Sequence, residues 1–181
     1  MKLAVFFHCL FVHPDTGEII PNAIRIASDQ MDTLKSCGLL EAADSFSVGI
    51  NGGEESRVFA SAIIPEKAEL VFHGRQCHNE IRTISHLQKT MSGKPGWSVL
   101  YFHTKGAMYD PNNDMINNWR NCMMRHLVSG WRSCRDLLSS GYESVGCHWM
   151  PNTIDGTITI WGGNFWWATS EFIATLPPIE N

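Results

Sequence analysis

The sequence predicts an α/β fold in which a mostly parallel central sheet carries helices on both faces. Along residues 1–106, short apolar runs rich in β-branched and aromatic residues alternate with stretches of helical periodicity. Strands that alternate with helices pair in parallel through βαβ units. A chain of 181 residues is long enough for one well-buried core and short for two. We therefore expect one Rossmann-like domain over residues 1–181.

Periodicity and turn residues place the elements of the N-terminal half. Residues 3–12 are apolar throughout, as in an interior strand of a parallel sheet, and residues 46–50 and 69–73 form shorter runs of strand type. Residues 22–37 have apolar side chains three or four apart, and Gly38 follows at a helix C-cap position. Helices are also expected at 54–60 and 78–91, and a fourth strand begins at Trp97. We expect residues 1–106 to be a nucleotide-binding half.

Residues 107–181 follow another pattern. Residues 113–140 are helical in period, with a break near Ser129 and Gly130. Strands are expected at 142–149 and 157–161, and a short helix at 170–175.

Charge and cysteine content narrow the class of protein. A formal net charge of −4, from 14 basic and 18 acidic residues, provides no broad basic surface for nucleic acid. The six cysteines include no C-x-x-C pair, which favours free thiols in a reducing cytoplasm over three disulfides in a secreted protein. Residues 3–12 imitate a signal peptide, but His8 interrupts them, and no apolar run approaches the roughly 18 residues of a membrane span. We expect a cytoplasmic protein.

The fourth strand ends in polar and charged residues that a buried core does not need. Trp97 to Tyr101 are followed by Phe102, His103, Thr104, Lys105 and Gly106. Because ligands bind at the carboxyl ends of strands in open α/β sheets, His103 and Lys105 are placed to meet an anion such as a diphosphate. Their alternation puts both on one side, and Gly106 lets the backbone turn away. The alternative is a solvated lysine and a hydrogen-bonded histidine at an ordinary strand end.

Further along, single polar residues offer other roles. Arg120 is a candidate for anion binding, or a solvated helix residue. Asp110 and Asp114 lie in an oxygen-rich loop that suits a hard cation, although the pattern favours turn and helix-cap chemistry. Glu143 is a candidate carboxylate base and His148 another imidazole, although both could be rim or core residues.

The second informative stretch is Gly162-Gly163-Asn164-Phe165-Trp166-Trp167-Ala168. An indole covers the C–H face of a sugar ring, and the Asn164 amide can read a hydroxyl with a donor and an acceptor. Since neighbouring side chains in a strand point to opposite faces, at most one of Trp166 and Trp167 packs inward. The alternative is a corner that only packs the core.

At these residues the chain resembles a family of small bacterial and viral glycosyltransferase-like proteins. The resemblance runs through the Phe102–Gly106 and Gly163–Ala168 motifs and covers roughly residues 97 to 177. It implies a GT-A-type fold, a nucleotide-sugar donor and transfer of the sugar to an acceptor hydroxyl, as in glycan biosynthesis.

One departure concerns the metal. GT-A enzymes usually hold a divalent cation, Mn²⁺ or Mg²⁺, with an Asp-x-Asp motif, whereas this chain has His103-Thr104-Lys105. Either Lys105 and His103 replace the charge of the cation, or His103 ligates a metal together with Asp110. The chain is also short for this fold, so a homodimer or a partner could complete the acceptor site.

The resemblance therefore implies a glycosyltransferase in which residues 107–181 bind the sugar or the acceptor. A glycan is the expected acceptor, and a modified nucleic-acid base is left open. The alternatives are a catalytically silent sugar- or nucleotide-binding module and a His-based metallohydrolase, for which no H-x-H or H-E-x-x-H motif is present. We assign His103, Lys105, Glu143 and Asp110 to catalysis and no residue to a metal. The expected substrate-binding residues are His8, Asn51, Thr104, Gly106, Arg120, His148, Gly163, Asn164 and Trp166.

Overall fold

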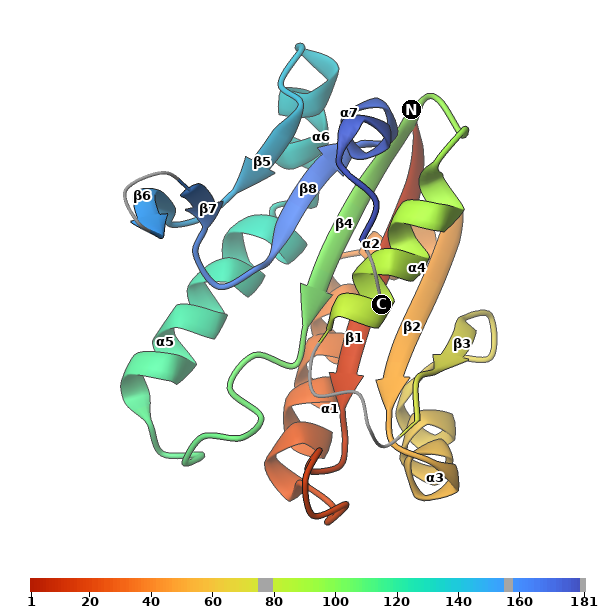
Figure 1. Ribbon diagram of the computed structural model, residues 1–181, viewed down its shortest axis with the longest axis vertical. Helices are drawn as coiled ribbons and strands as arrows, with labels where there is room; N and C mark the ends of the chain where they lie inside the picture. Colours follow the sequence, from red (N-terminus) through yellow and green to blue (C-terminus); the bar gives the residue numbers. More distant parts are fainter. Residues whose placement is uncertain (75–79, 155–157, 180–181) are drawn as a thin grey trace.

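The protein is built around a six-stranded sheet in the order β3-β2-β1-β4-β8-β5 (Figure 1). The computed structural model describes residues 1–74, 80–154 and 158–179. Four parallel strands form one side of the sheet, and β8 joins them to β5 in the antiparallel sense. The strands are β1 (Lys2–Leu10), β2 (Ser45–Asn51), β3 (Glu69–Phe72), β4 (Trp97–His103), β5 (Ser144–Gly146) and β8 (Trp166–Thr169).

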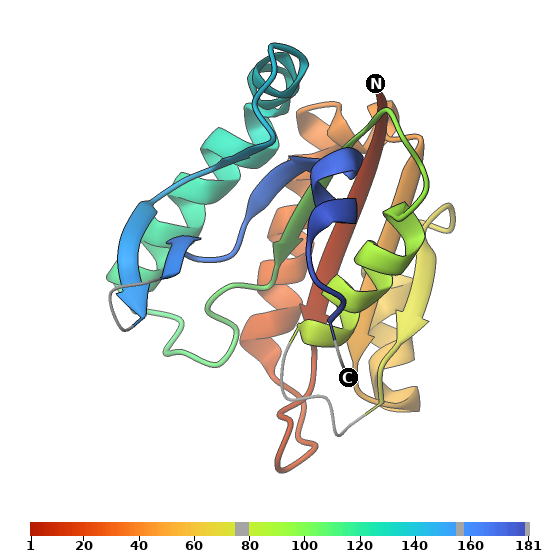
Figure 2. The same cartoon turned by 45° about the horizontal axis from the view of Figure 1, so that its top comes forward.

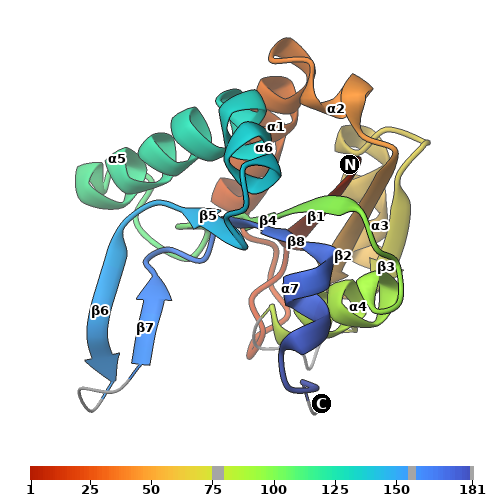
Figure 3. The ribbon, with the colours of Figure 1, turned by 90° about the horizontal axis from the view of Figure 1, so that it is seen from above.

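Helices cover both faces of this sheet, which confirms the predicted α/β class (Figure 3). One face carries α4 (Ile81–Met91) and α7 (Ser170–Thr175), which lie side by side (Figure 2). The other face packs against α1 (Pro21–Ser36), α2 (Leu39–Ala42), α3 (Glu54–Ile63), the π-helical turn η1 (Met124–Ser129) and α6 (Trp131–Ser139), and α5 (Asp114–Met123) leads into η1. No helix of the described residues is long and apolar enough to cross a membrane.

Strand β1 is buried on both faces because its alternate side chains enter two separate cores. Val5 and Phe7 belong to the large core beneath α1, whereas Ala4 and Phe6 belong to the smaller core beneath α4 and α7. This double burial explains why the strand is apolar throughout. His8 follows Phe6 on the α4 side, so the alternation aims a polar side chain at that helix.

The same alternation operates in β8. Trp167 is fully buried, and its Nε1 donates a hydrogen bond to the carbonyl of Leu127 at 2.8 Å. Trp166 points to the opposite face, where its ring lies 5.4 Å from that of Tyr101. The expectation that the two indoles would diverge is confirmed.

Most predicted elements are present, with shifted ends in the second half. The break at Gly130 is confirmed between η1 and α6. The strand expected over 142–149 is wrong in extent, because only Ser144–Gly146 pair with the sheet. A separate hairpin of β6 (Trp149–Ile154) and β7 (Ile158–Trp161) then stands apart from the sheet (Figure 3). Five cysteines are free, and Cys77 lies outside the described residues.

Candidate functional site

The polar residues gather where the order of the strands reverses. The chain runs from β1 through α1 to β2 on one side, while β4 lies on the other side of β1. His8 at the end of β1 and His103 at the end of β4 are direct partners in this pairing. In open α/β sheets, ligands bind at such a switch point, outside the carboxyl ends of the strands.

A cavity of about 250 Å³ lies at this point. Its floor is formed by the ends of β1, β2 and β4, and its wall by the segment that follows β4. The lining residues are His8, Leu10, Asn51, Glu80, His103, Thr104, Lys105, Gly106, Ala107, Met108 and Tyr109. The structure therefore brings together six of the residues that we selected from the sequence, and it adds Glu80.

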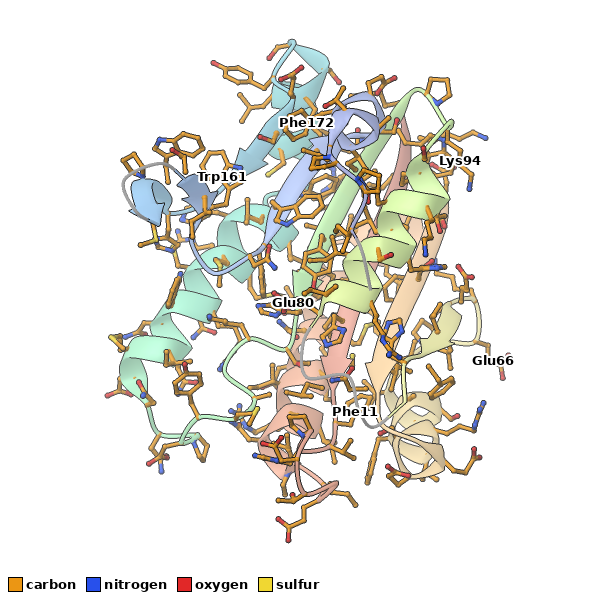
Figure 4. The ribbon with its side chains drawn as sticks, in the orientation of Figure 1. Phe11, Glu66, Glu80, Lys94, Trp161 and Phe172 are labelled. Atoms are coloured by element: carbon orange, nitrogen blue, oxygen red, sulfur yellow. The ribbon has the colours of Figure 1, made fainter. Side chains whose placement is uncertain are left out.

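Glu80 and His103 form the central ion pair of the site. Glu80 precedes α4 and lies beside the end of β4 (Figure 4). Its carboxylate contacts Nδ1 of His103, while Nε2 of His103 lies 3.2 Å from the carbonyl oxygen of Gly163. Both ring nitrogens thus face oxygen acceptors, an arrangement that only the doubly protonated imidazolium satisfies.

Hydrogen bonds connect the pair of Glu80 and His103 to Asn164 and Trp166 of the second motif. The Asn164 amide nitrogen donates to Glu80, and its oxygen accepts a hydrogen bond from Nε1 of Trp166 at 2.9 Å. Asn164 has a positive φ of 55°, a conformation that asparagine tolerates better than most residues. Burial alone would raise the pKa of the Glu80 carboxyl, but the hydrogen bonds and charge of His103, with the bond from Asn164, lower that pKa to about 2.

A second polar group lies beneath the cavity and joins two histidines through one hydroxyl. The Oγ1 of Thr83 lies 2.7 Å from Nδ1 of His8 and 2.8 Å from Nε2 of His73. A hydroxyl has one proton, so Thr83 donates to one ring and accepts from the other, which couples the tautomers of the two histidines. Gly49 makes room for this contact, since a Cβ there would lie 2.0 Å from the Thr83 oxygen.

Both of these histidines are held in the neutral form. Burial is the main cause that lowers the pKa of His8 to about 3, and the nearby His103 adds to it. Burial followed by the charge of Arg82 lowers the pKa of His73 to about 4. The site thus combines a cationic imidazole with two neutral ones.

Lys105 provides the second cation at the cavity. It does not continue the strand, because β4 ends at His103 and the Lys105 amide donates back to the His103 carbonyl at 2.7 Å. The expected alternation of these two residues along a strand is therefore wrong. The Lys105 ammonium lies 4.5 Å from the centre of the Trp119 ring, and no carboxylate of the residues described by the structure comes within 4.0 Å of it. Its charge is available to a ligand.

Arg120 supports this segment from below instead of lining the cavity. Its guanidinium donates to the Lys105 carbonyl at 3.0 Å and to the Asn117 side chain at 2.8 Å. Gly106, with a φ of 87°, fits against it, because a Cβ would approach Ile116 to 2.6 Å and Arg120 to 3.0 Å. Burial is the main cause that lowers the pKa of Arg120. The structure thus shows Arg120 positioning the Lys105 segment, and its contact with a diphosphate stays a prediction.

Three other selected residues lie outside both the cavity and the hydrogen-bonded group of His103, Glu80 and Asn164. Glu143 borders Thr169, which pairs with Ser98 near the beginning of β4. Ser98 lies five residues, or about 17 Å along the strand, from His103, which is too far for a base acting there. The Asp110 carboxylate accepts the backbone N–H of Asn112 at 2.8 Å in an exposed turn. His148 contacts the edge of Trp119, with ring centres 5.9 Å apart, and the Lys105 ammonium lies over the same indole.

The donors that the structure describes at the site are already engaged with protein groups and form no metal clamp. Both His103 nitrogens are engaged, Asp110 is used in its turn, and the Asn113 side chain caps α5 by accepting the Ile116 N–H at 3.1 Å. Within residues 1–74, 80–154 and 158–179, no group of three His, Cys, Asp or Glu side chains is placed to hold an ion.

Glu80, His73 and Thr83 were not selected from the sequence. Thr83 and Ser85 are buried while Ile81 is 41% exposed, so α4 turns a polar face toward the sheet. The sequence feature that could have indicated them is in β2, where one face carries the small or polar residues Ser47, Gly49 and Asn51. Such a face leaves space for hydrogen-bonding side chains from a covering helix.

Comparison with known proteins finds distant structural likenesses. No family model matches the chain. No curated protein matches its sequence. A solved structure of CMP:2-keto-3-deoxy-manno-octonic acid synthetase complexed with CTP is similar over 96% of this chain and 76% of that one, with 6% identity and a TM-score of 0.45. The 4-diphosphocytidyl-2C-methyl-D-erythritol synthase of Anaerococcus prevotii is similar over 96% and 72%, with 8% identity and a TM-score of 0.47. Such distant likenesses carry no argument about activity.

Proposed function

We propose that the protein is a glycosyltransferase that uses a nucleotide-sugar donor and binds the diphosphate of the donor in the cavity between the ends of β1 and β4. The observation that carries this proposal is the ammonium of Lys105 at the switch point of the sheet, which has no carboxylate of the described residues within 4.0 Å. A diphosphate is the ligand that such a cation suits best, because charge-assisted hydrogen bonds to phosphate oxygens are among the strongest available to a protein.

The ion pair of Glu80 and His103 has a different task in this proposal. Since both nitrogens of His103 are engaged, the ring has no free N–H for a phosphate and instead fixes the Gly163 carbonyl and the Glu80 carboxylate. Glu80 in turn holds Asn164. The Gly163–Asn164 corner is thereby tied to the end of β4, next to the point where the sugar of the donor would lie.

In this proposal the sugar passes directly from the donor to the acceptor, and no protein side chain forms a bond to it. The acceptor oxygen forms a bond to the anomeric carbon, the bond from that carbon to the diphosphate oxygen breaks, and the acceptor proton and the nucleoside diphosphate leave. Lys105 stabilises the charge that develops on the departing diphosphate. Because the donors among the described residues form no metal clamp, we derive no step through an ion.

The experiment is a binding and turnover series with UDP, GDP, CDP and ADP and their glucose conjugates. A ligand at a hundred times its Kd stabilises the native state by about 2.7 kcal/mol, which is visible as a rise in melting temperature. Release of nucleoside diphosphate from one donor supports the transferase. Binding without release would indicate a silent binding module, and the absence of both binding and release would contradict the proposal.

A further inference from the structure

A second hollow lies on the other side of Asn164 from the cavity. It is a groove of about 360 Å³ between the β6–β7 hairpin and α7, floored by β8. Figure 4 labels one residue from each wall, Trp161 on the hairpin and Phe172 on α7. The groove therefore adjoins the proposed site without belonging to it.

The walls of this groove are almost entirely apolar. The indoles of Trp149, Trp161 and Trp166 line it, and the polar side chains on the lining are those of Ser144, Thr159 and Asn164. Trp149 is 59% exposed and Leu176 is 42% exposed. Apolar surface collected in one hollow of a water-exposed face marks a place where a ligand or partner binds.

The hairpin wall is packed rather than loosely attached. The rings of Trp149 and Trp161 lie 4.6 Å apart at their centres, and Trp161 packs directly on the backbone of Gly146. A Cβ at Gly146 would lie 2.5 Å from that indole, so the glycine permits the contact. The groove thus has a preformed aromatic wall.

The groove has one polar end, and this end faces the cavity. Asn164 lines the groove and donates to Glu80, which lines the cavity and pairs with His103. A molecule lying in the groove with a hydroxyl at Asn164 would present that hydroxyl beside the proposed site of the donor sugar. Its remaining part would lie against Trp149, Trp161 and Leu176.

From this arrangement we propose that the groove binds the hydrocarbon part of an amphiphilic acceptor, an alkyl or aryl glycoside whose hydroxyl-bearing head reaches Asn164. The inference rests on the proposed transferase and names its acceptor class. A chain of several sugars fits less well, because each buried hydroxyl needs a hydrogen-bond partner and the lining provides three polar side chains. A hydrocarbon chain needs none and gains from leaving water.

The test compares n-octyl β-D-glucoside, kept below its micelle-forming concentration, with methyl β-D-glucoside on the full chain by calorimetry. We expect the octyl compound to bind at least thirtyfold more tightly. Trp149→Ala should lower the octyl affinity about tenfold, equivalent to about 1.4 kcal/mol. Tyr142→Ala is the matched control, since Tyr142 is 60% exposed and lies outside the groove. Leu176→Ala is a second groove variant, in case Trp149→Ala does not fold.

Four results would overturn the inference. Equal affinity for both glucosides would assign the groove to the sugar itself, and no binding of either would leave it without this ligand. An octyl affinity unaffected by both groove variants would place the chain elsewhere. A stable dimer that is lost on Trp149→Ala would make the groove a contact between copies. Nucleoside diphosphate binding, measured on the same samples, reports separately on the transferase.

Discussion

Replacing Glu80 by glutamine tests whether the ion pair at the end of β4 holds the site together. Glu80 accepts hydrogen bonds from His103 and Asn164, two residues that are distant from it in sequence. Glutamine keeps an acceptor for Asn164 and removes the negative charge that pairs with the imidazolium. We expect Glu80→Gln to destabilise the fold, and Glu80→Ala to do so more strongly.

The magnitude follows from the burial of the pair. Removing one partner of a fully buried pair costs about 3–5 kcal/mol. Here the side chains of His103 and Glu80 are 15% and 23% exposed, and water screens part of the interaction. We therefore expect a loss of about 1–2 kcal/mol for Glu80→Gln and about 2–3 kcal/mol for Glu80→Ala, which also leaves Asn164 without its acceptor.

The assay is urea unfolding of a double-mutant cycle with His103→Gln. Because the folded pKa of Glu80 is about 2, below its ordinary 4.5, its contribution is complete above pH 4.5 and is lost as the pH falls toward 2. The coupling energy should then be about 1–2 kcal/mol at pH 5, where the Glu80 carboxylate is ionised in the folded protein. Additivity within about 0.5 kcal/mol would refute the pair as a stabilising element.

Three further predictions concern the rest of the site. The folded pKa of His8, about 3, lies below its unfolded 6.5, so the native state binds fewer protons and its stability should fall with pH below 6.5, by up to about 1.4 kcal/mol per pH unit. Urea unfolding at pH 7, 6 and 5 should show a smaller dependence of stability on pH in His8→Asn and the wild-type dependence in His126→Gln, an exposed control. The wild-type dependence in His8→Asn would exclude His8 as its source. Gly49→Ala should cost about 2–4 kcal/mol in urea unfolding, because its Cβ would overlap the Thr83 hydroxyl, whereas Ser47→Ala on the same strand should cost about 1 kcal/mol; equal costs would contradict the packing. EDTA should change donor affinity less than about twofold, the scale of a difference below 0.5 kcal/mol, and a complete loss restored by Mn²⁺ would reverse this.

Periodicity was sufficient for the sheet and for most helices, since an apolar run such as Leu3–Phe7 has few alternatives to an interior strand. The second half was harder to predict from sequence. Only three residues of β5 pair with the sheet, and the β6–β7 hairpin is stabilised by aromatic contacts such as Trp149 with Trp161, which have no periodic signature. Contacts between residues that are distant in the sequence determine where these strands begin and end.

Only part of the candidate site could be predicted from the sequence. His103 and Lys105 stand out because they interrupt an apolar run, and a strand end is a known place for ligands. Glu80 and Thr83 do not stand out, since a polar residue near a helix start is usually solvated. Their role depends on which face of α4 meets β2, and that was settled by the small side chains of β2 and not by α4 itself.

The most direct test of the central proposal is the affinity of Lys105→Ala for the nucleoside diphosphate that the wild-type protein binds. Lys94→Ala is the matched control, because Lys94 is exposed beyond the far end of α4 from Glu80 (Figure 4). We predict that Lys105→Ala weakens binding by about 1.5–3 kcal/mol, roughly ten- to a hundredfold, with an unchanged melting temperature of the free protein within a few degrees, while Lys94→Ala binds as the wild type does. A folded Lys105→Ala protein with unchanged affinity would show that the diphosphate does not bind at the switch point and would contradict the account.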